Sequence, residues 1–123
     1  MKSVPVVLLQ SDPEIARTLS ASLANSFPAV HLTQSISELR HAAAKPQPPI
    51  MIVDLETATF SDVESLKRDF HATRIICNHR LADDEMWTRA LTAGADDCCP
   101  SSDTRGIVDS AVAQRQTAAG VGA

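Results

Sequence analysis

Few aromatic residues and few glycines occur in this sequence. It has no Tyr, one Trp and three Phe, and only four Gly among its 123 residues. Loops that bind nucleotide phosphates through their backbone need closely spaced glycines, and neither the G-x-G-x-x-G nor the G-x-x-x-x-G-K-[ST] pattern is present. The G-x-S-x-G pattern of serine hydrolases is also missing. These absences exclude the common nucleotide-binding and hydrolase motifs, and we expect a protein that is not an enzyme.

An excess of positive charge is missing as well. The chain has 15 acidic and 11 basic residues and a net charge of -4. Nucleic acids and anionic lipids attract basic surfaces, so we expect neither as a direct partner. No apolar run approaches the roughly 20 residues of a membrane span, and the run at 4–9 is shorter than the apolar region of about 7–15 residues in a signal peptide. Three cysteines, an odd number, then favour reduced thiols in the cytoplasm.

Short apolar runs alternate with segments of helical spacing. Runs rich in branched residues predict strands at 4–9, 50–55 and 74–77, and weaker candidates lie at 30–32 and 95–99. Apolar residues spaced as on one helix face follow each run. Helix starts are indicated by Asp12 before Pro13, by Ser35 and Ser61 with Glu three residues later, and by Asp83 and Asp103. This alternation predicts an α/β fold with a parallel sheet covered on both faces, formed by residues 1–117 and followed by a flexible tail or linker at 118–123.

Three stretches carry a resemblance to a known family. They are VVLLQSDPEI at 6–15, IMIVDLE at 50–56 and RALTAGADDCCPSSD at 89–103. The residues of these stretches and their separations along the chain resemble those of the CheY-like receiver domain of bacterial response regulators. The resemblance implies a flavodoxin-like (βα)5 fold with strand order 2-1-3-4-5, a role in two-component phosphorelay signalling, and a site at the carboxyl ends of the strands.

The same resemblance assigns the residues of that site. Asp54 matches the aspartate that accepts a phosphoryl group, whereas the acidic pair that holds Mg²⁺ falls on the uncharged Gln10 and Ser11. The hydroxyl residue that ends the fourth strand falls on His79, directly after Asn78. These positions predict a phosphoacceptor without its metal ligands.

Two more positions of the family's switch also differ. The aromatic residue of the fifth strand falls on Cys98, and the lysine that pairs with the phosphoryl group falls on Ser101, or on Cys99 if the alignment shifts. No Lys follows Lys67, so no shift restores it. The resemblance therefore implies a degenerate receiver, or pseudo-receiver, with no cofactor and at most weak Mg²⁺ binding.

Two alternatives stay open for Asp54. The domain could still be phosphorylated there, with Arg80 supplying the missing cation and Glu56 one metal ligand. Asp54 could instead be purely structural and accept a hydrogen bond from Ser11 or His79.

A different class of function, a thiol or metal sensor, would use Cys77, His79, Cys98 and Cys99, because the fourth and fifth strands are expected to be neighbours. Tetrahedral zinc sites use such ligands. The spacing, however, is not C-x-x-C, and adjacent cysteines in a strand point to opposite faces. Packing is the favoured interpretation for these residues, and no metal site is predicted.

Trp87, the only Trp, falls within the fourth helix. It would serve either as an anchor for a partner, since buried Trp residues dominate many interfaces, or as peripheral core. The resemblance implies protein partners: a signalling kinase, an effector domain or a second copy of the chain.

Overall fold

The computed structural model describes residues 6–44 and 48–120, and for 114–120 the backbone alone. Five parallel strands form one sheet in the order β2-β1-β3-β4-β5. The predicted flavodoxin-like (βα)5 fold is confirmed. The strands are β1 (Val6–Leu9), β2 (Val30–Thr33), β3 (Ile50–Asp54), β4 (Arg74–His79) and β5 (Asp97–Pro100), and the helices are α1 (Pro13–Ala24), α2 (Ile36–Ala43), α3 (Phe60–Asp69), α4 (Asp84–Ala93) and α5 (Thr104–Gly120).

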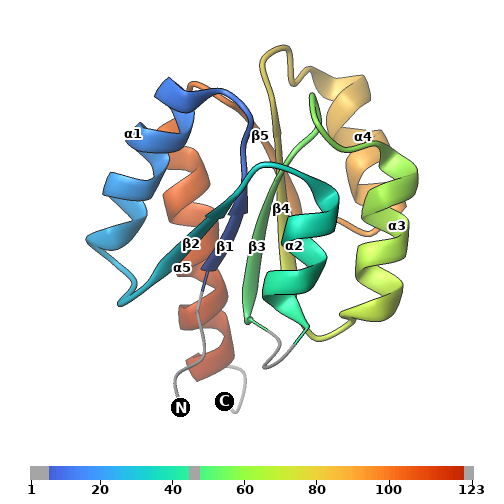
Figure 1. Ribbon diagram of the computed structural model, residues 1–123. Coiled ribbons are helices and arrows are strands. Elements are labelled where there is room, and N and C mark those ends of the chain that lie inside the picture. The colour runs from blue at the N-terminus through green and yellow to red at the C-terminus, as the bar shows by residue number, and fades with distance from the viewer. Residues whose placement is uncertain (1–5, 45–47, 121–123) are drawn as a thin grey trace.

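Helices cover the sheet on both faces, with α1 and α5 on one side and α2, α3 and α4 on the other (Figure 1). Alternate residues of each strand enter the two cores, so that Val7 and Met51 pack with the α2–α4 layer and Leu8 and Ile52 with the α1 and α5 layer. Both faces are apolar. The continuous apolar runs of β1 and β3, buried at every position, follow from this arrangement.

The helices start where short polar side chains accept backbone hydrogen bonds. Asp12 caps α1, Ser35 caps α2 and Asp83 caps α4, as predicted. Asp103 accepts from the Gly106 N–H in the first turn of α5 at 3.0 Å. The prediction for α3 was wrong, because its capping box joins Thr59 and Asp62, two residues before the Ser61–Glu64 pair.

Several boundaries differ from the sequence predictions, among them the start of β5, which is at Asp97 and not at 95. β4 continues past Cys77 to His79. The backbone of α5 continues through Gly120, beyond the predicted boundary at 117. The predicted loop at 45–49 falls partly outside the described residues. None of the helices described is both long enough and apolar enough to cross a membrane.

Gly94 ends α4 with a φ of 120°, a backbone conformation that residues other than Gly rarely adopt. A Cβ atom there would also lie 2.9 Å from the Lys67 side chain. The chain reverses at this point and enters β5, so Gly94 within the Ala-Gly-Ala-Asp stretch is required by the backbone.

Candidate functional site

Asp54 is the last residue of β3 and lies at the carboxyl edge of the sheet, only 1% exposed. Its Oδ1 accepts a hydrogen bond from the Glu56 N–H at 3.0 Å. Its Oδ2 accepts from the Thr57 hydroxyl at 2.8 Å and from the Ser11 hydroxyl at 3.4 Å. All three donors are neutral. The predicted bond from Ser11 is present, while Thr57, a residue that the sequence analysis missed, makes the shorter one.

Beside Asp54 lies a chain of buried polar side chains from three strand ends. Asn78 Oδ1 accepts from Gln10 Nε2 at 3.3 Å and from the Ser101 hydroxyl at 2.8 Å. The three residues are at most 2% exposed. Gln10 also accepts from the Asp12 N–H through Oε1 at 3.0 Å, and Asn78 Nδ2 lies 3.5 Å from the Val53 carbonyl. We call Gln10, Asn78 and Ser101 the polar network.

The structure places Asn78, not His79, in this network. Asn78 is the register partner of Asp54 on the neighbouring strand, whereas His79 follows it and turns away. His79 Nδ1 accepts the Leu81 N–H at 2.9 Å, so it holds the loop that leads to α4. The polar Asn that follows the apolar run RIIC was the available signal for a buried hydrogen-bond partner, and the sequence analysis did not use it.

Two charged residues considered as replacements for the lost groups bind each other instead. The Arg80 guanidinium donates to both carboxylate oxygens of Glu56, with Nη2 at 2.8 Å from Oε1 and Nε at 3.3 Å from Oε2, and the Arg80 N–H donates to Oε2 at 3.2 Å. Hydrogen bonding from Arg80 lowers the pKa of Glu56 below its ordinary value. Asp12 is committed to the cap of α1, where Oδ1 accepts two N–H groups. Both nearby acids are therefore engaged.

The three cysteines and His79 do not come together in one site. Cys77 and Cys98 are register partners that pack with the α2–α4 layer, whereas Cys99 packs with the α1 and α5 layer. Burial raises the pKa of Cys98 to about 11 and of Cys99 to about 12, and raises that of Cys77 further. The thiolate is the form that binds metals and attacks disulfides, so these buried thiols are poorly suited to a sensor. Among the described residues, no group of three or more His, Cys, Asp or Glu is placed to hold a metal ion.

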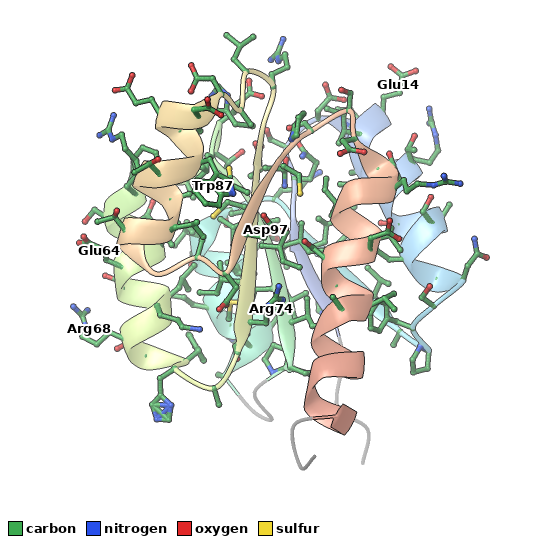
Figure 2. The ribbon with its side chains drawn as sticks, turned by 180° about the vertical axis from the view of Figure 1, so that it is seen from behind. Glu14, Glu64, Arg68, Arg74, Trp87 and Asp97 are labelled. Carbon is green, nitrogen blue, oxygen red and sulfur yellow. The ribbon has the colours of Figure 1, made fainter. Side chains whose placement is uncertain are left out.

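Trp87 lies on α4, on the far side of the molecule from Glu14 at the start of α1 (Figure 2). Trp87 is 47% exposed. Ala90 and Ala93 form the buried face of the same helix, and Leu91 is half-buried. Trp87 is thus a partly covered surface residue.

Comparison with solved structures identifies this architecture. The receiver domain of a Francisella response regulator is 14% identical, with 92% of this chain and 97% of that chain covered and a TM-score of 0.81. The signal receiver domain of a DNA-binding response regulator from Colwellia psychrerythraea is 18% identical over 92% and 98% of the two chains, with a TM-score of 0.78.

A LuxR family DNA-binding response regulator from Silicibacter pomeroyi is 19% identical, with 92% of each chain covered and a TM-score of 0.75. The chain has the CheY-like fold of response regulator receiver domains. No protein-family model and no curated protein matches its sequence. In this receiver fold the carboxyl edge of the sheet carries Asp54, its three neutral donors and the polar network.

Proposed function

We propose that this chain is a two-component-type signalling module, a degenerate receiver that acts in the cytoplasm through protein–protein contacts. In this proposal, ordinary Mg²⁺-dependent phosphorylation does not switch it. Its partner would be a signalling kinase, an effector domain or a second copy. The observation that carries the proposal is the polar network, because Gln10 and Ser101 stand where the receiver resemblance implies a metal-binding acid and a lysine.

The charges that are missing matter energetically. A carboxylate about 4 Å from a divalent cation contributes up to about 8 kcal/mol at an effective dielectric near 20, before desolvation and screening reduce it. A surviving fraction of only about 1.4 kcal/mol would change Mg²⁺ affinity tenfold for each carboxylate. Asp12 and Glu56 do not replace this contribution in the structure, since the first caps a helix and the second pairs with Arg80.

The missing cation weakens phosphoryl transfer separately. The transferred group carries negative charge on its oxygens, and positive groups fixed nearby normally stabilise it. Lys67 donates to the Thr73 carbonyl at 2.9 Å and to Asp96 at 3.3 Å, at the opposite end of the strands from Asp54. Arg80 remains the nearest candidate, and it is held by Glu56.

The alternative is a receiver that is still phosphorylated on Asp54. One observation supports this alternative: the Ser11 and Thr57 hydroxyls beside Asp54 Oδ2 could donate hydrogen bonds to a phosphoryl oxygen. The thiol or metal sensor has no such support, because the three thiols are divided between the two faces of the sheet.

Amide NMR spectra recorded with millimolar Mg²⁺ and beryllofluoride test the proposal. We expect no change in the wild-type spectrum. Gln10→Asp with Ser11→Asp should gain Mg²⁺ binding, and adding Ser101→Lys should restore a response to beryllofluoride. A control with the same added charge, Ala21→Asp with His71→Asp at exposed positions, should gain neither. Wild-type shifts centred on Asp54 and spreading to α4 would favour the phosphorylated alternative.

A further inference from the structure

The two edge strands of the sheet differ in how well their sequences protect them. An open strand edge carries unpaired backbone groups that can pair with another chain, and charged residues and Pro are common devices against such pairing. β5, at one edge, begins with Asp97 and ends with Pro100. β2, at the other edge between α1 and α2 (Figure 1), has the sequence Val-His-Leu-Thr, without Asp, Glu, Lys, Arg or Pro. β2 therefore lacks the devices that protect an open edge.

The residues of β2 turn their backbone groups alternately to the two sides of the strand. The Thr33 carbonyl accepts from the Gln10 N–H at 3.2 Å, so the backbone groups of Thr33 face β1. In a parallel ladder the N–H and C=O of one residue point to the same side, and those of the next residue point to the other side. Val30 and Leu32 therefore direct their N–H and C=O groups to the open edge, where no described strand lies beside them.

The side chains of these two residues are apolar and lie on one face of the sheet. Val30 packs partly against the α1 and α5 layer, and Leu32 lies on the same side and is 42% exposed. His31, between them, is exposed on the opposite face, where it lines a hollow of about 420 Å³ together with Glu38 and His41 of α2. The open edge thus has an apolar face and a polar face.

From this arrangement we propose that the open edge of β2 pairs with β2 of a second copy of the chain, in an antiparallel two-fold arrangement centred on His31. Leu32 of each copy would lie opposite Val30 of the other, and each such pair would exchange two backbone hydrogen bonds. The inference rests on the proposed function in one respect, because it names the partner of the contact-acting module as a second copy.

A second copy is the occupant because the edge is complementary to itself. On the α1 side, Leu32 and Val30 of the two copies would cover one another. On the α2 side, the two His31 side chains would lie side by side, and imidazoles are mostly neutral above pH 7. The ladder would end after these residues, since Pro28 has no N–H and the Gln34 N–H already donates to Glu38 at 2.7 Å. Two-fold symmetry supplies all of these matches at once.

Amide exchange in the intact chain, measured by NMR from micromolar to millimolar protein concentration, provides the first test. At low concentration we expect slower exchange at His31 and Thr33, which bond to β1, than at Val30 and Leu32. At high concentration exchange at Val30 and Leu32 should slow as well, because their N–H groups would then be bonded to the second copy. The paired surface is small, so the dimer should be weak. Exchange that stays the same at both residues across the series would overturn the inference.

Substitutions at His31 test the register, because a residue on the two-fold axis lies opposite its own copy. His31→Asp and His31→Lys should each weaken dimerisation at least about tenfold, since like charges would lie directly opposite. An equimolar mixture of the two variants brings opposite charges together and should restore dimerisation to near the wild-type level. The matched controls, His71→Asp and His71→Lys at an exposed position before β4, should leave dimerisation unchanged, both alone and mixed. Analytical ultracentrifugation measures the dimer.

Each other outcome contradicts the inference in a recognisable way. Dimerisation that the His31 variants leave unchanged would place self-association on another face, and weakening without recovery in the mixture would exclude a register centred on His31. Slow exchange at Val30 and Leu32 in a monomer would mean that another segment covers the edge. None of these results alters the Mg²⁺ and beryllofluoride response, so failure here remains distinct from failure of the proposed function.

Discussion

The Asp54 edge of the sheet differs from the surface around the start of α4, residues 81–87, which we call the α4 surface, in where the side chains find their partners. At the Asp54 edge, polar side chains are buried and bonded to one another: Gln10 and Ser101 to Asn78, and Thr57 to Asp54. On the α4 surface, Leu81, Trp87 and Asp84 are exposed. Buried polar groups that are fully paired hold one conformation, whereas substitutions of exposed side chains usually change stability little. The first region therefore supports the fold and the second is available for contact.

Asn78→Ala should produce the largest effect, because it removes the centre of the polar network. Gln10 Nε2 and the Ser101 hydroxyl would both lose their acceptor in a buried site. An unpaired buried polar group costs about 1–3 kcal/mol, so we expect a loss of about 2–4 kcal/mol in the free energy of unfolding. Urea denaturation measures it.

A compensated variant sharpens this test. Gln10→Leu, Asn78→Leu and Ser101→Ala together leave no unpaired side chain in the network, and only the Asp12 N–H and the Val53 carbonyl lose a side-chain partner. Replacing all partners by apolar groups is often close to neutral. The triple variant should therefore be more stable than Asn78→Ala alone, while exposed Asn25→Ala should change stability by no more than about 0.5 kcal/mol. If Asn78→Ala matches Asn25→Ala, water reaches the network and the contrast between the two regions fails.

The sequence predicted the fold better than the site. The parallel sheet with helices on both faces follows from the continuous apolar runs in β1, β3 and β4 and the helical segments between them. The strand order was implied by the receiver resemblance. The site depends on which of two adjacent residues turns inward, and period-2 alternation does not decide this at a strand end. That is why the sequence did not predict that Asn78, the register partner of Asp54, would join the polar network while His79 would not.

The sequence also did not predict which charged side chains far apart along the chain would pair. Glu56 and Arg80 follow different strands, and both were considered as separate additions to the Asp54 site. They meet because β3 and β4 are adjacent and end in register, with Asp54 opposite Asn78. Likewise, the capping box of α3 at Thr59 was missed because Ser61 and Glu64 offer the same spacing.

Trp87→Ala should have a small effect on stability, in contrast to Asn78→Ala. A surface substitution typically changes the free energy of unfolding little, and we expect a loss of about 1 kcal/mol or less because part of the ring is covered. Phe70→Ala is the matched aromatic control. Phe70 is 7% exposed and packs in the core, so its truncation should cost about 3–5 kcal/mol. A Trp87 loss in the range of Phe70 would mean that the residue is part of the peripheral core and not a surface residue.

Glu56→Gln should have the smallest effect on stability. It tests the contact between the two regions, because the Glu56–Arg80 pair joins the Asp54 edge to the loop before α4. Hydrogen bonding from Arg80 lowers the pKa of Glu56 in the folded state. A lowered folded pKa means that the pair stabilises the fold above the unfolded value of about 4.3 and that this contribution is lost as the pH falls through the folded pKa. Because Arg80 is largely exposed, the contribution is small and is screened by salt.

The thermal midpoints of wild type and Glu56→Gln should accordingly differ slightly at pH 7, and the difference should disappear in acid. Glu64→Gln, at an exposed position of α3, provides the matched control and should show no such pH dependence. Faster amide exchange at Leu81 in Glu56→Gln, without a matching change at Asn78, would show that the pair orders the loop before α4 and leaves the polar network intact. A difference that grows as the pH falls would contradict the assigned pairing, because protonated Glu56 has no charge to offer Arg80.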